Sequence, residues 1–404
     1  MATNNNDKTL NVPPLRFPEF TEEWLHCTLG DITTNFNLRN KNEVEYPMYS
    51  VTNNRGFIPQ SEQFEDREML GEDIKAYKII HKDDFAYNPA RINVGSIAKY
   101  DGEQPCMISS LYVCFKTNPQ IYNDWMAQLL KTPKMNYYYN TNGEGGVRIY
   151  LFYPNFARIR TSYPATLSEQ KKIAHFLTLL DERIATQNKI IEKYESLIQA
   201  MCDTWIESEQ HKVELSFSDF GKSYSGLSGK SAEDFGEGCP YITYMNVYQN
   251  QIIDTTNVGL VKINETEQQS VVHYGDILFT LSSETAEEVG MGAVYLGDIN
   301  PLYLNSFCFG IHIIDANKIF PPFLAFYVST KSFRRVVFPL AQGSTRFNLQ
   351  KNDFMKKGFS FPTVERQRKI YSALKTYSDK LSVEKSIAKL LCKQKNHLLS
   401  QLFI

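Results

Sequence analysis

Two short segments carry residue types that perform chemistry in other proteins, but neither has the full pattern. The first, GLSGKS at 226–231, ends in Gly-Lys-Ser, as a phosphate-binding loop does. That loop requires a glycine five positions before its second glycine, and Tyr224 stands there. We therefore interpret this segment as a polar turn and not as a nucleotide site.

The second segment, Asn88-Pro89-Ala90-Arg91, is similar to the Asn-Pro-Pro-aromatic loop of enzymes that methylate base amino groups. It lacks the second proline and the aromatic ring that would stack on a flipped base. Asp73 and Lys75 form part of a nuclease-like pattern, without a suitably placed acidic partner. The seven histidines show no metal-ligand spacing. We expect no catalytic residue, no metal and no cofactor in this chain.

The composition is that of an ordinary globular chain of two or three domains. The chain has 404 residues, of which 42% are hydrophobic and 22% charged, and its net charge is −2. This balance argues against general coating of nucleic acid but allows a local basic groove. The seven cysteines are scattered, and the sequence contains neither a secretory leader nor an apolar run of membrane length. We expect reduced thiols and a cytoplasmic location.

One long amphipathic segment, 166–205, organises the chain. Its apolar residues recur at steps of three and four, the pattern of a coiled-coil stripe, and neither Pro nor Gly interrupts it. Thr166 followed by Glu169 predicts a capping box at its start. The expected stripe consists of Ile173, Leu177, Leu180, Ile184, Ile191, Tyr194, Ile198, Met201 and Trp205, with Gln187 as its one polar position.

The same pattern returns at residues 363–404, which we expect to form the partner helix. It lies 197 residues later, so that Gln170 matches Gln367. The second stripe consists of Ile370, Leu374, Tyr377, Leu381, Leu391 and Leu398. It is weaker, since Glu384 and Lys395 occupy seam positions. Because a long apolar stripe needs a partner, we predict that the two helices pack antiparallel.

The segments before the two helices also repeat. His81 and Asp84 match His273 and Asp276, and helix-like segments at 125–140 and 323–338 match as well. A helix is expected over Tyr122–Tyr138, and a Gly-x-x-Arg loop follows in both halves, at Gly145–Arg148 and Gly343–Arg346. Strands are expected at Tyr46–Thr52, Ile79–Tyr87, Ser96–Tyr100 and Leu111–Thr117. Such a long internal repeat indicates two similar units.

We therefore predict an α+β fold with two similar globular domains and a pseudo-two-fold internal repeat. Two long antiparallel coiled-coil helices would separate the domains and act as a spacer. The expected parts are a flexible N-terminal arm at 1–14, a first domain at 15–165, a long helix at 166–212, a second domain at 213–362 and a C-terminal helix at 363–404.

The remaining hypothesis is that the chain recognises a target. The two halves repeat the same order of predicted helices and strands, but the loops at equivalent places differ. Residues 88–96 and 280–292 occupy equivalent places and differ almost completely. Arg and Asn side chains can pair bidentately with guanine and adenine edges. The candidates are Asn53, Asn54, Arg55, Asn88, Arg91 and Asn93 in the first half, and Asn246, Thr280, Ser282 and Ser283 in the second. A structural ion pair for Arg91 and a turn cap for Asn88 are equal alternatives.

Two further arginines, Arg148 and Arg346, stand in the repeated Gly-x-x-Arg loops. Because they recur, we expect them to contact phosphate or to brace the fold, and not to read sequence.

The arrangement resembles the specificity subunit of a type I restriction-modification system. The residues that carry the resemblance are LRFPEF with Glu23-Trp24, YSVTNNRGFIP, NPARINVGSIAKY, the two Gly-x-x-Arg loops, the aromatic-Pro turns at Tyr163-Pro164 and Phe361-Pro362, and the helix starts Glu169–Ile173 and Arg366–Ile370. Two features depart from the pattern: the second half lacks the FPEF lead, and Arg366 replaces the acid before Gln367.

The resemblance implies a non-catalytic DNA-binding subunit. Each globular domain would be a target-recognition domain that reads one half of a bipartite double-stranded DNA site. The two helices would set the length of the unspecified gap between the half-sites. The helices would also dock two methyltransferase subunits, which bind S-adenosylmethionine and methylate adenine, and motor-nuclease subunits would complete the restriction complex. The alternative from the residues alone is a protein-binding scaffold with two recognition domains spaced by a coiled coil.

Overall fold

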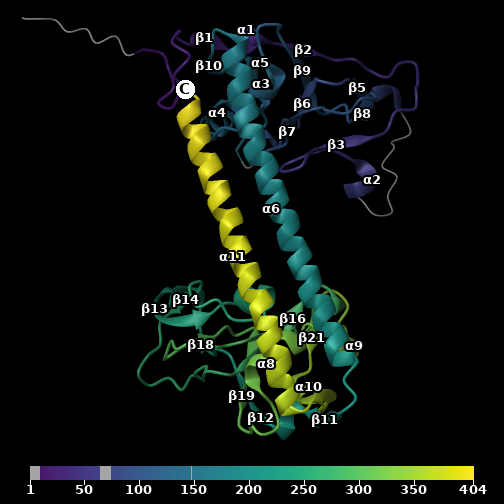
Figure 1. The fold of residues 1–404 in the computed structure, drawn as a ribbon, viewed down its shortest axis with the longest axis vertical. Helices are drawn as coiled ribbons and strands as arrows, with labels where there is room; N and C mark the ends of the chain where they lie inside the picture. Colours follow the sequence, from purple (N-terminus) through teal and green to yellow (C-terminus); the bar gives the residue numbers. More distant parts are fainter. Residues whose placement is uncertain (1–9, 64–73, 147) are drawn as a thin grey trace, which may run out of the picture. The chain divides into compact units, whose positions relative to one another are not determined.

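The computed structural model describes residues 10–63, 74–146 and 148–404 (Figure 1). The chain forms two compact units. Unit 1 comprises Met1–Asn188 and Ser386–Ile404, and unit 2 comprises Lys189–Lys385. Each long helix contributes one part to each unit, so helical and globular segments share a core in both.

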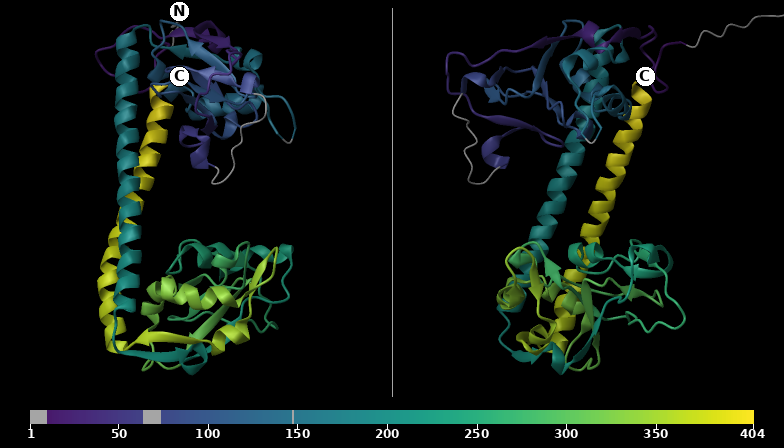
Figure 2. Two further views of the ribbon diagram at one scale, coloured as in Figure 1. Left: turned by 90° about the vertical axis from the view of Figure 1, so that its right-hand side faces the viewer. Right: turned by 180° about the vertical axis from the view of Figure 1, so that it is seen from behind.

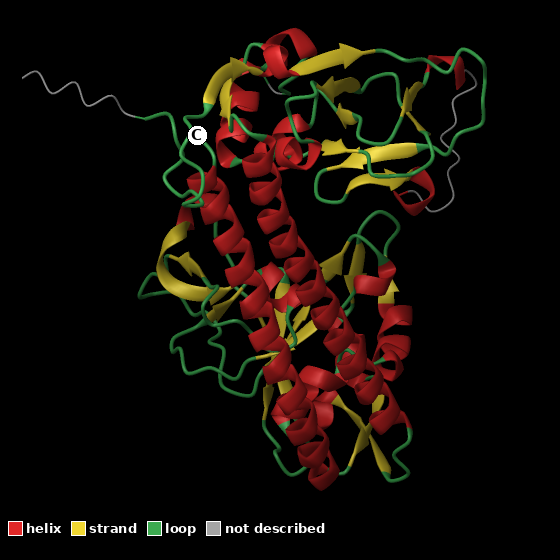
Figure 3. Ribbon diagram, turned by 45° about the horizontal axis from the view of Figure 1, so that its top comes forward, coloured by secondary structure: helices red, strands yellow, loops and turns green. Residues whose placement is uncertain are grey.

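The two long helices predicted from the heptad pattern are confirmed. They are α6, Leu167–Glu207, and α11, Val364–Leu402 (Figure 3, red). Within the described residues, no helix combines the length and apolarity needed to cross a membrane.

Unit 1 is built on a four-stranded antiparallel sheet of order β2-β9-β6-β7. Three strand pairs accompany it: β1-β10, β3-β4 and β5-β8. The strands are β1 Leu25–Thr28, β2 Thr33–Phe36, β3 Tyr49–Thr52, β4 Gly56–Pro59, β5 Lys78–Ile80, β6 Phe85–Tyr87, β7 Ile97–Lys99, β8 Cys106–Ile108, β9 Val113–Thr117 and β10 Arg160–Tyr163. The strand expected over Ile79–Tyr87 is thus two strands, because a turn at His81–Asp84 separates β5 from β6.

Unit 2 repeats this plan with the antiparallel sheet β12-β19-β15-β17 and the pair β11-β22. Two three-stranded sheets, β14-β13-β18 and β16-β21-β20, are added to it. The strands are β11 Lys212–Ser216, β12 Gly221–Ser225, β13 Phe235–Ile242, β14 Gly259–Val261, β15 Ile277–Thr280, β16 Ser282–Ser283, β17 Gly292–Val294, β18 Tyr303–Leu304, β19 Cys308–Ile313, β20 Ala341–Gln342, β21 Phe347–Leu349 and β22 Gly358–Pro362. The α+β fold and the internal repeat are confirmed.

The short helices repeat as well, and they correct one prediction. The helix expected over Tyr122–Tyr138 is two helices, and so is its counterpart at 323–338. Thr132 and Thr330 cause the breaks, because each side-chain hydroxyl caps a new helix by accepting from the backbone N–H three residues later. The helices are α1 Leu29–Ile32, α2 Gln60–Gln63, α3 Asn123–Leu129, α4 Pro133–Asn142, α5 Tyr153–Ala157, α7 Tyr244–Gln249, α8 Pro321–Tyr327, α9 Lys331–Val337 and α10 Lys351–Lys356.

In unit 1 the start of α6 and the end of α11 run antiparallel and join the domain core (Figure 2). Ile173 and Leu177 of α6 share a buried cluster with Leu402 of α11 and with Trp24 and Trp125 of the globular part. Burial of such side chains stabilises by about 1.5–3 kcal/mol each. The helix pair is therefore part of the fold of unit 1.

Unit 2 uses the other ends of the same helices. Ile198 of α6 joins Ile370 and Leu374 of α11 in one buried cluster with the β15 and β19 strands. Tyr377, predicted to lie in the seam, is 37% exposed, so its assignment to the apolar stripe is wrong. The remaining stripe residues are buried or half-buried.

The N-terminal arm predicted at 1–14 is not free where the structure describes it; residues 1–9 lie outside the described residues. The backbone carbonyl of Asn11 accepts from Trp24 N at 2.9 Å, and its side-chain amide donates to Trp24 O at 2.6 Å. Leu15 N donates to Gln401 O at 3.0 Å. This segment is tied to the domain and to α11.

The predicted capping box at the start of α6 is half correct. Glu169 N donates to Thr166 Oγ1 at 3.4 Å, as expected. The Glu169 carboxylate, however, accepts two bonds from Arg16 at 2.7 and 2.8 Å and one from Trp24 Nε1 at 3.1 Å. The acid therefore ties the helix to the N-terminal segment.

Candidate nucleic-acid interface

Two loops that carry predicted recognition residues meet in unit 1. One is the turn Asn53–Arg55 between β3 and β4, and the other is the loop 88–96 between β6 and β7. They meet at Gly95, whose φ is +101°. A Cβ at Gly95 would lie only 2.4 Å from Asn53 O, so this close approach requires glycine.

Hydrogen bonds hold the second loop in place. Asn88 N donates to Ser96 O at 3.0 Å, and the Asn88 side-chain oxygen accepts from Ala90 N at 3.0 Å. Ser96 Oγ donates to Val51 O at 2.6 Å, which fixes the loop to β3. Asn88 therefore has the turn-capping role that was the alternative for it, and its amide oxygen is already used.

Arg91 and the amides of Asn53 and Asn54 are exposed where the loops meet. Together with Asn88 and Tyr112 they line a hollow of about 600 Å³. A guanidinium and two amides on one surface can offer several hydrogen-bond donors and acceptors to base edges. The sequence thus named four residues that the fold brings together.

Two other candidates of unit 1 lie beside this hollow. Asn93 is half-buried and donates from its amide to Asn140 Oδ1 at 3.0 Å. Arg55 forms an exposed ion pair with Glu62 at 2.9 Å. Such exposed pairs stabilise by about 0–1 kcal/mol, so Arg55 can leave Glu62 for another anion at little cost.

Unit 2 has its own hollow, of about 330 Å³. It contains three predicted residues, Ser282, Ser283 and Arg346. Aromatic and sulfur-containing side chains form the rest of the wall together with two acids: Tyr244, Met245, Tyr248, Phe307, Glu284 and Glu288. Phe307 is 59% exposed and Met245 47% exposed, so both side chains are accessible to a ligand in this hollow.

Three predicted contacts in unit 2 are corrected by burial. Asn246 is 1% exposed, and its amide donates to the backbone carbonyls of Asp254 and Asn257 at 2.9 and 2.8 Å. Thr280 is fully buried, and its hydroxyl accepts from Met291 N at 3.1 Å. Asn246 and Thr280 hold loops together and do not face a ligand.

Ser283 is the third predicted contact that burial corrects. It is 6% exposed, although it borders the hollow, and its hydroxyl donates to Thr285 O at 2.5 Å. Its hydroxyl proton is therefore already engaged inside the protein.

Asn246, predicted to contact DNA from a loop, lies on helix α7 instead, on the face that points inward. Thr243 caps this helix by accepting from Asn246 N at 3.2 Å, which turns Asn246 inward. Tyr244 and Tyr248, four residues apart, then share the opposite face, and their rings stack at 5.9 Å. The i, i+4 spacing of the two tyrosines was the signal that could have identified them.

The phenol groups of this face are anchored by the protein. Tyr244 OH donates to Ser282 O at 2.7 Å, and Tyr248 OH donates to Glu288 Oε1 at 2.6 Å. Burial raises the pKa of Tyr244, and the hydrogen bond to Glu288 raises the pKa of Tyr248. Both groups stay protonated at neutral pH, so the hollow is suited to contact and stacking.

The glycines that open the two Gly-x-x-Arg loops share a positive φ and a close approach to the carbonyl of the loop arginine. Gly145 has φ +113° and Gly343 has φ +133°. A Cβ would lie 2.3 Å from Arg148 O in the first loop and 2.1 Å from Arg346 O in the second. Both arginines are exposed, and Arg346 lines the hollow of unit 2. Whether they contact phosphate stays a prediction.

One group of described residues has side chains suited to hold a metal ion, and it lies outside these hollows. His273, Asp276 and His312 place their ligand atoms within 4.8 Å of one another. The two histidines are 39 residues apart, a spacing that no short metal-binding motif has.

Comparisons with known proteins define the class. Residues 216–391 match the family described as type I restriction modification DNA specificity domain. An S subunit of a type I restriction-modification system from M. genitalium shares the fold, with a TM-score of 0.54 and 16% identity, over 97% of this chain and 99% of that one. No curated protein matches at a significant level.

A chain from a structure on complex assembly and conformational transition of a type I R-M system is also similar. Its TM-score is 0.56 at 13% identity, and the match covers 95% of this chain and 98% of that one. Residues 216–391 thus match the type I DNA specificity domain family, and the whole chain has the S-subunit fold. The resemblance seen in the sequence is confirmed, and the family is one of specificity domains and not of catalytic ones.

Proposed function

We propose that this chain is the DNA sequence-recognition subunit of a type I restriction-modification complex. Each unit reads one half of a bipartite site in double-stranded DNA. The observation that carries the proposal is the family match of residues 216–391, combined with the repetition of the same sheet in unit 1. Two domains that share the same sheet but differ in their loops can recognise two different half-sites.

In unit 1 we assign base contacts to the exposed side chains where the two loops meet. Arg91, Asn53 and Asn54 supply the donors and acceptors that pair with guanine and adenine in the major groove. Asn93 and Arg55 lie at the side and contact the backbone or a neighbouring base. Asn88 shapes the loop and does not read a base.

In unit 2 the assignment falls on the hollow beside α7. Arg346 contacts phosphate, as does Arg148 of the equivalent loop in unit 1. Tyr244, Phe307 and Ser282 form the surface that meets the groove. Aromatic and methionine side chains on this surface suit contact with thymine methyl groups.

Partner subunits supply what this chain lacks. Its net charge of −2 gives little general attraction to DNA, so two methyltransferase subunits, docked on the long helices, provide the basic surface and bind S-adenosylmethionine. They methylate adenine, and restriction subunits bind the same core. The complex works in the cytoplasm, where the DNA is. The helices set the gap between the half-sites.

The test is to co-express this chain with its neighbouring methyltransferase subunit and to map methylated adenines by single-molecule sequencing. We expect methylation at one split motif, with fixed bases on both sides of an unspecified gap. Failure of the two proteins to associate, or methylation without any motif, would contradict the proposal and favour a protein-binding scaffold.

A further inference from the structure

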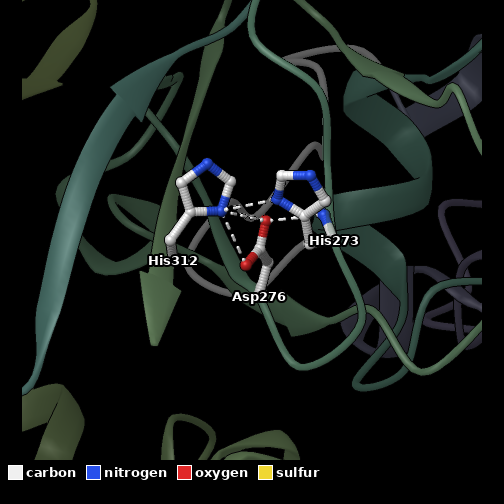
Figure 4. Close-up of side chains that lie close together, drawn as sticks. All are labelled: His273, Asp276 and His312. Atoms are coloured by element: carbon white, nitrogen blue, oxygen red, sulfur yellow. Dashed lines mark hydrogen bonds and ion pairs between the residues drawn. The ribbon is translucent and has the colours of Figure 1, made fainter. Parts of the chain in front are cut away.

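A compact group of potential ligands lies at one end of β15 and β19, the two central strands of the main sheet of unit 2 (Figure 4). His273 and Asp276 stand in the turn before β15, and His312 stands on β19. His312 Nδ1 lies 2.9 and 2.8 Å from the two carboxylate oxygens of Asp276 and 3.3 Å from His273 Nδ1. Three side chains from two segments thus converge on one point.

The surrounding residues hold the carboxylate in a fixed orientation. Asp276 is 2% exposed, and its Oδ2 accepts from His273 N at 2.9 Å and from Tyr224 OH at 2.7 Å. Burial raises the pKa of Tyr224, so its hydroxyl remains a donor. Hydrogen bonds of this kind orient the ligands of metal ions.

The ring of Tyr224 also fixes His312. The two rings stack with centroids 4.2 Å apart and an interplanar angle of 22°. Gly310 leaves the space for this ring, because a Cβ there would lie 2.1 Å from Tyr224. His312 therefore has one face covered by the phenol, and its Nδ1 is aimed at Asp276 and His273.

The separation of the two histidine nitrogens matches a tetrahedral metal site, whereas the contacts of His312 Nδ1 with the Asp276 carboxylate, at 2.9 and 2.8 Å, have the length of hydrogen bonds. Two zinc–nitrogen bonds of about 2.0–2.1 Å at a tetrahedral angle separate the nitrogens by roughly 3.4 Å. The observed Nδ1–Nδ1 separation is 3.3 Å. A single proton between the three side chains can form a hydrogen bond in only one of these contacts. A metal cation, by contrast, can be coordinated by His273, Asp276 and His312 at once.

Unit 1 offers a comparison at the equivalent place. There His81 and Asp84 are retained, but Lys116 of β9 stands where His312 stands on β19. Lys116 Nζ lies 3.4 Å from Asp84 Oδ1, and His81 Nδ1 lies 3.7 Å from Asp84 Oδ2. Unit 1 thus neutralises the buried carboxylate with its own ammonium group, which unit 2 lacks at this place.

We propose that His273, Asp276 and His312 bind one divalent transition metal ion, with Zn²⁺ as the best fit to two imidazoles and a carboxylate. His273 is exposed and His312 is 30% exposed at its side chain, so water reaches the fourth position. The bound ion ties the turn before β15 to β19 and takes the place that Lys116 fills in unit 1. This site is structural and independent of the DNA-reading hollow.

The test is zinc binding by the full chain, alone or with its methyltransferase partner, measured by isothermal titration and by native mass spectrometry. We expect one Zn²⁺ per chain and a higher melting temperature when ZnCl₂ is added. The decisive variant is His312→Lys, which copies unit 1 and should keep the fold. It should bind zinc at least about tenfold more weakly and lose the zinc-dependent rise in melting temperature.

Two further variants complete the design. His273→Ala removes an exposed ligand and should also lose the ion, whereas His397→Ala, an exposed histidine on α11, should bind zinc normally. X-ray absorption should show nitrogen and oxygen ligands; a Zn–S distance near ~2.3 Å would assign the ion to a cysteine. Equal zinc binding by His312→Lys and the unsubstituted chain, or no binding by the latter, overturns the proposal.

Discussion

Gln170 and Gln367 make the same pair of hydrogen bonds at the starts of the two long helices. Gln170 Oε1 accepts from Tyr122 N at 2.7 Å, and Gln367 Oε1 accepts from Phe320 N at 2.8 Å. Their side-chain NH₂ groups donate to Pro164 O at 3.1 Å and to Pro362 O at 2.8 Å. Both glutamines are fully buried. One side chain thus joins each helix to the globular part of its own unit.

Replacement of either glutamine by leucine should lower the free energy of unfolding by about 1–3 kcal/mol. The reason is that a buried backbone N–H, of Tyr122 or of Phe320, loses its acceptor. Chemical denaturation of the full chain and of each variant measures the change in the free energy of unfolding. Gln210→Leu, at an exposed position, is the matched control and should change stability little. Equal stability of Gln170→Leu and Gln210→Leu would contradict this account.

Each long helix begins with an ion pair to a residue outside the helix, but the positions of the acid and the base are exchanged between the two units. Glu169 of α6 pairs with Arg16, whereas Arg366 of α11 pairs with Glu209 at 2.7 Å. Arg366 thus keeps an ion pair at the position where the family pattern has an acid. Glu169 is 2% exposed and bonds three donors, whereas the side chain of Arg366 is 43% exposed.

Glu169→Ala should therefore destabilise the protein by about 3–5 kcal/mol, because the Arg16 guanidinium loses its carboxylate partner and keeps its hydrogen bond to Glu22 O, and Trp24 Nε1 loses its acceptor. Glu209→Ala should destabilise the protein much less, because the side chain of its partner Arg366 is half-exposed and such pairs contribute little. Melting temperatures of the two variants, measured side by side, check the ranking. A larger loss for Glu209→Ala would show that the two pairs are wrongly ranked.

Arg91→Ala should reduce methylation at the native motif by roughly 10–100-fold and relax specificity at one base pair of one half-site. The estimate follows from the loss of a bidentate base contact, which is worth about 1–3 kcal/mol. Asn246→Ala is the contrasting variant: it should lower stability and leave the motif unchanged, because its buried amide bonds to backbone groups and to the Asn250 side chain inside unit 2. Methylation mapping of both variants gives the answer, and an unchanged motif in Arg91→Ala would remove this residue from the interface.

Arg148→Ala and Arg346→Ala should weaken DNA binding without altering the motif. Each lost phosphate contact should reduce the slope of log K against log salt by about one. Lys262→Ala serves as a control, because Lys262 does not line the hollow of unit 2. Binding of the assembled complex at several salt concentrations measures the slopes. A shifted motif in either arginine variant would mean that the loop reads bases.

Thiol reactivity should follow burial. Burial raises the pKa of Cys106 and of Cys308 to about 12, so at pH 8 only about one thiol in 10⁴ is the reactive thiolate. Cys392 is exposed on α11 and should react first with iodoacetamide. Labelling over time, followed by peptide mass spectrometry, checks the order. Early modification of Cys308 would indicate that the core of unit 2 opens.

Local patterns predicted the helices and the repeat well, because a heptad stripe and a helix cap depend on residues close in sequence. The break before Pro133 was missed, although Thr132 followed by Pro is a normal helix start. Asn246 was assigned to the surface because the inward face of α7 depends on the cap at Thr243. His312 lies close to His273 because β15 pairs with β19 in the sheet. The spacing of residues in the sequence cannot predict this pairing.

The most direct test of the central claim is to exchange residues 213–362 for the corresponding segment of another specificity subunit and to map methylation again. If each unit reads one half-site, one half of the motif should change while the other half and adenine methylation persist. A motif that changes in both halves, or in neither, would contradict the assignment of one half-site to each unit.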